Sequence, residues 1–161
     1  MKDILKIALE FEKKGYALYF DVSKKTKNPL VKSIFDYLSS QEERHVAEIE
    51  AYIQKNKLEL AGDDAKKTER FFNMTVREFK GHLELVKEDS DAYEKGLHLE
   101  KDAYEFYKSK LSEAKTEDVR KFLKFLMEQE NAHYVLIQNT YEYSKDPKHF
   151  FAQNERSFFE G

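Results

Sequence analysis

The sequence predicts an all-α protein built as a four-helix bundle, with a long crossover between the second and third helices and a short helical tail at the C-terminus. Three observations support this fold. Residues that interrupt helices are scarce, since the 161 residues include two prolines and five glycines. Apolar residues recur at helical spacing in four segments. Two stretches also repeat one pattern, position for position, 88 residues apart.

The length and the internal repeat together predict a single domain. We expect the bundle over residues 1–145, with two similar halves at about 3–56 and 91–144 and a crossover at 57–89. A tail is expected over residues 146–161. The tail is rich in phenylalanine, which favours packing against the bundle or against a partner subunit, and both remain open. Its aromatic residues are Phe150, Phe151, Phe158 and Phe159.

The expected helix starts also repeat in register. Asp3 and Asn28 precede the two helices of the first half, and Asp91 and Thr116 hold the same places in the second. Each of these side chains can accept the free N–H groups of a first helical turn. Pro29 follows Asn28, and proline is favoured at the first helical position. The links within each half are short, which predicts antiparallel neighbours.

The crossover carries its own turn and helix signals. Gly62-Asp63-Asp64 predicts a turn. Thr75-Val76-Arg77-Glu78 has the spacing of a capping box, which predicts that a short helix begins there. A connection of this length allows the third helix to lie beside the first.

The composition excludes several classes of protein. Charged residues make up 37% of the chain but the net charge is only -3, which argues against a nucleic-acid partner. No run of 18 apolar residues is present, so no membrane span is expected. The N-terminus lacks the apolar segment of a signal peptide, and a cytoplasmic location is the expectation. The absence of cysteine excludes thiol chemistry and cysteine-bound metals within this chain.

Metal-ligand residue types are retained in both copies of the repeat. Each copy has a lone Glu on its first helix and a Glu-x-x-His pair on its second, which is the ligand set that four-helix bundles use for two metal ions. The six residues are Glu12, Glu42, His45, Glu100, Glu130 and His133.

The charge of these residues supports the same hypothesis. All four Glu residues stand within apolar stripes that should meet in the bundle centre, where unpaired carboxylates are costly and repel one another. Lys13 and Lys101 follow the lone Glu residues but point about 100° away around the helix. Two divalent cations would balance the four carboxylates.

The helical spacing suggests a role for each ligand. Residues at i and i+3 share one face, so Glu42 would bridge two ions while His45 binds one of them. Glu130 and His133 would act alike for the other ion, with the two lone Glu residues as terminal ligands. Mixed carboxylate and imidazole ligands suit two iron ions, and manganese or zinc would also fit. Calcium and magnesium prefer oxygen ligands alone.

Two pairs of tyrosines repeat with the same shift. Tyr19 and Tyr107 lie two turns beyond the lone Glu residues, where a phenol would donate to a ligand carboxylate of a neighbouring helix. Tyr16 and Tyr104 repeat too, so either pair could be the one that reaches. Packing in the core is the other interpretation of all four side chains.

Other potential ligands lack the paired spacing. His82, His98 and His149 have no Glu three residues before them, so they are interpreted as surface or packing residues. Glu48 and Glu50 would suit an accessory metal site, but a solvated helix face explains them better.

At these motifs the chain resembles the rubrerythrin family over about residues 1–144. The resemblance implies a ferritin-like four-helix bundle with a non-haem diiron site, which is often dimeric and reacts with peroxide or dioxygen. The phrases that carry it are Leu9-Glu10-Phe11-Glu12-Lys13-Lys14-Gly15-Tyr16, Glu42-Glu43-Arg44-His45, Leu99-Glu100-Lys101-Asp102-Ala103-Tyr104 and Glu130-Asn131-Ala132-His133.

Two departures from full-length rubrerythrins bear on the activity. Those proteins carry an extra Glu at the place of Ala103, and they end in a rubredoxin domain with four Cys ligands, whereas this chain has no Cys. Electrons would therefore come from a separate protein or a small reductant.

Three functions follow as hypotheses. The first is an oxidoreductase of the rubrerythrin peroxidase or oxidase type, which would act as a homodimer and reduce peroxide or dioxygen with an external electron donor. The alternative is an iron-handling, ferroxidase-like protein without sustained turnover. The third is a structural bundle with a decayed site, which the presence of all six ligand residues disfavours.

Overall fold

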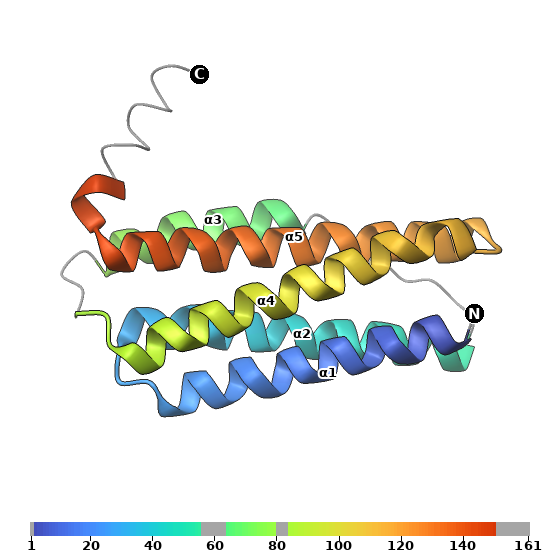
Figure 1. Cartoon of the computed structure of the whole chain (residues 1–161), viewed down its shortest axis with the longest axis horizontal. Coiled ribbons are helices and arrows are strands. Elements are labelled where there is room, and N and C mark those ends of the chain that lie inside the picture. Colours follow the sequence, from blue (N-terminus) through green and yellow to red (C-terminus); the bar gives the residue numbers. More distant parts are fainter. Residues whose placement is uncertain (1, 56–63, 80–83, 151–161) are drawn as a thin grey trace, which may run out of the picture.

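The computed structural model describes residues 2–55, 64–79 and 84–150 and is helical throughout its regular elements (Figure 1). The all-α prediction is confirmed. In chain order the elements are α1 (Lys2–Lys25), α2 (Pro29–Lys55), α3 (Asp64–Glu78), α4 (Lys87–Lys110), the 3-10 turn η1 (Leu111–Glu113) and α5 (Glu117–Lys145).

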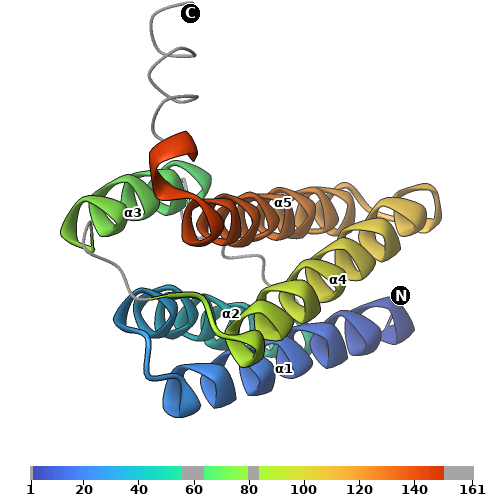
Figure 2. The same cartoon turned by 60° about the vertical axis from the view of Figure 1, so that its left-hand side comes forward.

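Four long helices form the bundle as two antiparallel hairpins. The first hairpin joins α1 to α2 and the second joins α4 to α5, and α4 lies along α1 (Figures 1 and 2). The crossover helix α3 lies outside this set, along α5 (Figure 2). No helix in the described residues is both long and apolar enough to cross a membrane.

Two of the four expected helix caps are present. The N–H of Leu30 lies 3.0 Å from Asn28 Oδ1, and the N–H of Val119 lies 3.2 Å from Thr116 Oγ1. The prediction for Asp3 and Asp91 was wrong, because α1 begins at Lys2 and α4 at Lys87. Acidic residues also favour the first turn of a helix, where they oppose the positive end of the dipole, so their presence alone did not fix the boundary.

The crossover helix begins earlier than predicted. Thr75 belongs to the end of α3 rather than to its start, and its side chain is buried. Phe72 and Val76 share this buried face and pack into the core, so tertiary packing outweighed the capping-box spacing. Asp64 opens the helix, while Gly62-Asp63 lies outside the described residues.

Two apolar clusters fill the two ends of the bundle. One contains Tyr19, Phe35 and Leu136, and the other contains Leu5, Leu123 and neighbouring residues. On each of the four long helices, one Glu of the repeat lies between the residues of one cluster and the residues of the other. The core therefore has a short polar layer with one apolar cluster on either side.

One residue of the aromatic tail packs on its own bundle. Phe150 is buried, and its ring lies 5.7 Å from Phe72 and 5.8 Å from Tyr143, measured between centroids. Phe150 therefore packs against its own bundle, which is one of the two arrangements that the sequence left open. Phe151, Phe158 and Phe159 lie outside the described residues.

Candidate metal centre

All six residues with metal-ligand chemistry converge in the bundle interior. One lone Glu comes from each of α1 and α4, and one Glu-x-x-His pair comes from each of α2 and α5. Their exposed fractions lie between 0% and 2%, which is rare for Glu. The six are Glu12, Glu42, His45, Glu100, Glu130 and His133.

These side chains form two overlapping groups that share two carboxylates. In each group one ligand atom of every member lies within 4.8 Å of the others. Glu42 and Glu130 belong to both groups, so their carboxylates are shared between the two. The first group adds Glu12 and His45, and the second adds Glu100 and His133.

Both imidazoles aim their Nδ1 atoms into this cluster. His45 Nδ1 lies 3.3 Å from Glu12 Oε2, and His133 Nδ1 lies 3.0 Å from Glu42 Oε1. His133 Nδ1 is also 3.4 Å from Glu100 Oε1. The two rings are stacked, with centroids 5.5 Å apart and planes inclined by 16°. Metal-ligating atoms from six side chains at such spacing can surround small cations without a large rearrangement.

Two buried phenols hold the lone carboxylates from across the bundle. Tyr19 on α1 donates to Glu100 Oε1 at 2.5 Å, and Tyr107 on α4 donates to Glu12 Oε1 at 2.9 Å. Burial first, and the nearby carboxylate charges second, raise the pKa of both phenols well above their usual value. Both therefore remain protonated donors at neutral pH. Tyr16 and Tyr104 are only partly buried.

No basic side chain neutralises the cluster within the described residues. The ion pairs that these acids make there are with His45 and His133. Lys13 points outward as expected and lies 3.7 Å from Glu50, with both side chains largely exposed. The acidic centre therefore depends on protons or metal ions for neutrality.

In the metal-free protein, protons concentrate on the two shared carboxylates. Burial raises the pKa of Glu42 and of Glu130, and the negative charges of Glu12 and Glu100 raise both further. Burial alone would also raise the pKa of the two lone Glu residues, Glu12 and Glu100. However, hydrogen bonds from Glu42 and His45 lower the pKa of Glu12, and those from Glu130 and His133 lower the pKa of Glu100.

Two observations show that the residues fit a pair of metal ions. Glu100 Oε2 and Glu130 Oε1 are buried and have no hydrogen-bond partner in the described structure, although buried acceptors are normally satisfied. The donor set of four carboxylates and two imidazoles is also the chemistry that first-row transition metals prefer. Two divalent ions would replace the shared protons and fill the remaining acceptor sites.

One of three comparisons with known proteins gives a match. The family model described as Rubrerythrin matches residues 3–141. The chain belongs to the rubrerythrin family. No curated protein and no solved structure gives a match.

Membership in the rubrerythrin family implies a ferritin-like bundle with a diiron or other metal site. The buried carboxylate and histidine groups are compatible with such a site. Ala103, where full-length rubrerythrins carry an extra Glu, is buried in an apolar cluster. The chain therefore offers no carboxylate at this position.

Gly15 is a site residue that the sequence reasoning missed. A Cβ added there would lie 3.1 Å from Glu42 Cδ and 3.3 Å from Glu42 Oε2. An added Cβ would be a tight contact, which Glu42 would relieve by shifting a few tenths of an ångström away from α1. A signal was available, because Gly15 lies one turn beyond Glu12 and Ala103 lies one turn beyond Glu100. Both copies therefore have a small residue facing the second helix of the pair.

The remaining candidate ligands lie elsewhere. His98 and His149 are exposed, and His82 falls outside the described residues. Arg44 Nε lies 3.6 Å from Glu48, and Lys13 lies 3.7 Å from Glu50, so both acids pair with basic side chains. The Glu48 side chain is only 13% exposed, which differs from the solvated face expected for it. These two acids form no metal-binding group with other residues of the described chain.

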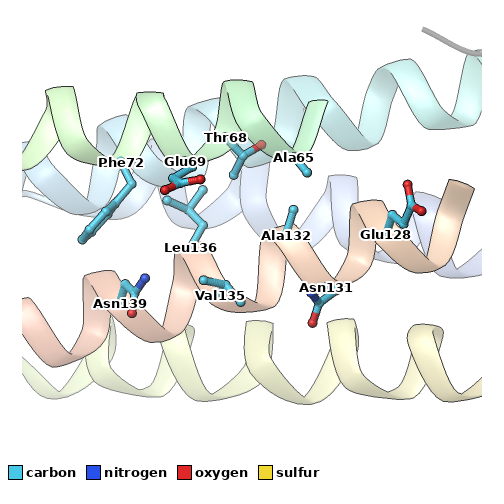
Figure 3. A pocket seen from close by; sticks show the side chains of 10 residues that line it. All are labelled: Ala65, Thr68, Glu69, Phe72, Glu128, Asn131, Ala132, Val135, Leu136 and Asn139. Carbon is cyan, nitrogen blue, oxygen red and sulfur yellow. The ribbon is translucent and has the colours of Figure 1, made fainter. Parts of the chain in front are cut away.

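A surface groove of about 350 Å³ runs between α3 and α5 (Figure 3). Phe72, Ala132 and Leu136 line it, with Glu69 and Asn139 among the polar side chains. None of the six cluster residues lines this groove, although Ala132 precedes His133 in the chain. The candidate metal centre is therefore enclosed by the bundle rather than open to this groove.

We predict that the metal-free protein loses stability as the pH rises from 5 to 8. Glu42, Glu130 and His45 bind protons more tightly in the folded state, since their pKa values are raised there, so deprotonation favours unfolding. Glu12 and Glu100 have lowered pKa values and are ionised in both states over this range. Chemical denaturation of chelator-treated protein at several pH values measures the effect.

The Glu130→Gln variant is the control for this pH dependence. An amide resembles a protonated carboxyl but does not titrate, so the variant should show a shallower fall. Added metal should raise the melting temperature more at pH 8 than at pH 5, because protons compete for the same ligands. A metal-free stability that is constant or rises between pH 5 and 8 would contradict the assigned pKa directions.

We also predict that Gly15→Ala weakens metal binding without destabilising the metal-free fold. The new methyl group would push Glu42 away from α1, while alanine is favoured over glycine within a helix by about 1 kcal/mol. Competition with a chelator should show an affinity lower by about tenfold, the scale of losses when ligand support is disturbed. Gly96→Ala is the matched control for packing, since a Cβ there would lie 3.0 Å from Ile137 and 3.4 Å from the Tyr19 ring but within 4 Å of none of the six cluster residues among its nearest neighbours. Equal affinities in the two variants would contradict a positioning role.

Proposed function

We propose that this protein is a diiron oxidoreductase that reduces hydrogen peroxide with electrons from an external donor. The observation that carries the proposal is the pair of buried Glu/His groups that share Glu42 and Glu130. This arrangement supports two ions held side by side and linked by carboxylates, which suits a reaction that needs two electrons at one place.

The chain would hold the two ions through ligands from four helices. Glu42 and Glu130 would bridge them, His45 with Glu12 would complete one side, and the corresponding residues of the second group would complete the other. When bound, two ferrous ions would supply the two electrons that, with two protons, convert hydrogen peroxide to two molecules of water.

The protein orients the metal ligands, supplies their charge and excludes water from the site. Tyr19 and Tyr107 fix the orientation of the lone carboxylates by hydrogen bonds, so these groups need little rearrangement when a cation binds. The apolar clusters at both ends exclude bulk water, which strengthens the attraction between carboxylates and cations. In the metal-free state, Glu42 and Glu130 retain the protons that the cations displace.

Iron is proposed as the native metal because the reaction requires a change of oxidation state. Zinc fits the same ligands but has no redox chemistry, and manganese remains an alternative. The chain has no cysteine to bind an iron–sulfur relay, which supports an external electron donor. A homodimer in the cytoplasm is part of the proposal, on the strength of the family resemblance and of the sequence.

The test is to load the protein with two equivalents of ferrous iron without oxygen and add one equivalent of peroxide. We expect stoichiometric loss of peroxide, a new near-UV absorption of ferric protein, and repeated turnover once a reductant is supplied. Protein loaded with zinc is the control, since it has the same ligands and should leave peroxide intact. Unchanged peroxide and spectrum would contradict the proposal, and a single oxidation followed by iron release would favour iron handling.

A further inference from the structure

We propose that Tyr19, Phe35, Tyr93 and Tyr141 form an aromatic relay that carries one oxidising equivalent from the metal centre to the protein surface. A small one-electron reductant, such as ascorbate, would take it up at Tyr141. The inference rests on the proposed function, since peroxide is the oxidant. It adds a protective route for turnovers in which the centre provides only one electron.

The four rings form a continuous path across the bundle, with one ring from each long helix. Centroid distances are 5.6 Å from Tyr19 to Phe35, 5.6 Å from Phe35 to Tyr93, and 5.1 Å from Tyr93 to Tyr141. Tyr93 and Tyr141 are stacked, with planes inclined by 20°. Phe35 is too hard to oxidise to hold the charge itself, so its ring serves as a tunnelling bridge that shortens the gap between the rings of Tyr19 and Tyr93.

The path begins at the metal-ligand layer and ends at the surface. Tyr19 donates its hydrogen bond to Glu100, one of the proposed terminal ligands, at 2.5 Å. Tyr19, Phe35 and Tyr93 are 0% exposed, so water cannot quench a radical on any of them. Tyr141 is only partly buried, and its hydroxyl reaches the exposed carboxylate of Glu94 at 3.1 Å.

Both ends of the relay have a base for the phenolic proton. A phenol that loses an electron becomes strongly acidic, so oxidation needs a nearby proton acceptor. Glu100 serves Tyr19 and Glu94 serves Tyr141. The Tyr93 hydroxyl lies 3.4 Å from Ser144 Oγ, which is not a base, so Tyr93 passes the electron without losing its proton.

The second half of the bundle lacks an equivalent path. The 88-residue shift relates Phe35, Tyr93 and Tyr141 to Leu123, Leu5 and Ile53, which are aliphatic. Tyr107 contacts Phe11 and Phe106 at 6.2 and 5.8 Å between centroids. Phenylalanine is far harder to oxidise than tyrosine, so a path that ends on these rings provides no phenol at the surface. The relay is therefore specific to Tyr19.

A charged side chain marks the surface end. Lys145 Nζ lies 3.8 Å from the centroid of the Tyr141 ring. A positive charge at this position attracts an anionic reductant and disfavours a positively charged ring, so Tyr141 would be oxidised together with loss of its proton. The Glu94 carboxylate lies beside the Tyr141 hydroxyl and offsets part of this charge, so the geometry supports a small one-electron reductant at this end, with ascorbate as the probe.

Reduction of one hydrogen peroxide to two waters consumes two electrons and two protons. Both protons come from solvent water. One electron comes from the metal centre, and the second comes from Tyr19, whose proton passes to Glu100. Tyr19 recovers its proton from Glu100 and an electron from Tyr141 by way of Phe35 and Tyr93, neither of which loses a proton. Tyr141 releases its own proton to solvent through Glu94, and ascorbate then returns one hydrogen atom to Tyr141.

The test uses full-length protein loaded with one equivalent of ferrous iron, so that the centre is short of electrons when peroxide is added. Samples frozen within milliseconds to seconds are examined for a tyrosyl radical by electron paramagnetic resonance. Parallel samples contain a nitroso spin trap, and peptide mass spectrometry locates the adduct. We expect a tyrosyl signal that ascorbate removes, and an adduct on Tyr141.

Tyr141→Phe keeps the stacked ring and removes the oxidisable phenol, so it separates the relay from a packing role. In this variant the adduct at position 141 should be lost, and the radical on the buried tyrosines should persist longer in ascorbate. Tyr52→Phe is the matched control, because Tyr52 is buried and stacked on Phe122 but lies off the path. It should behave as the natural protein does.

Two results would overturn the relay while leaving the proposed function intact. One is peroxide consumption by fully loaded protein together with no tyrosyl radical in the electron-poor sample. The other is a radical whose adduct position and ascorbate decay are the same in Tyr141→Phe as in the natural protein. If fully loaded protein consumes no peroxide at all, the proposed function fails and the relay fails with it.

Discussion

The burial of four carboxylates in one layer of the bundle is the constraint on which the rest of the structure depends. Glu12, Glu42, Glu100 and Glu130 are at most 2% exposed, and no lysine or arginine pairs with them in the described chain. Such a layer is stable only when protons or cations neutralise it. The hydrogen bonds from two buried tyrosines, the inward Nδ1 atoms and the space beside Gly15 all serve to hold this layer in one arrangement.

The internal repeat explains why so much of the centre could be predicted from the sequence. Glu42 and His45 interrupt an apolar stripe that continues to Ile49 and Tyr52, and the same interruption recurs 88 residues later. A polar residue in an apolar stripe is visible in one dimension, because helical periodicity alone determines the face on which it lies. The convergence of the six side chains and the reach of Tyr19 and Tyr107 follow from this periodicity and from the antiparallel hairpins.

Other features depend on contacts that no local pattern contains. The start of α3 was misplaced because the Thr75 spacing resembles a cap, whereas packing of Phe72 and Val76 determines where that helix runs. The repeat places small residues at Gly15 and Ala103, but the role of Gly15 also depends on the Glu42 side chain that faces it from α2. The aromatic path crosses four helices, so its members are distant in sequence and only the folded structure shows that they touch.

The most direct test of the account is the metal content of protein purified from its native cells, measured together with Glu42→Gln made in the same way. The account predicts two transition-metal ions per chain in the natural protein. It also predicts loss of both ions in the variant, because one shared carboxylate contributes to both groups. Fewer than two ions in the natural protein, or a variant that retains its full metal content, would contradict the claim that a pair of cations neutralises the buried acidic layer.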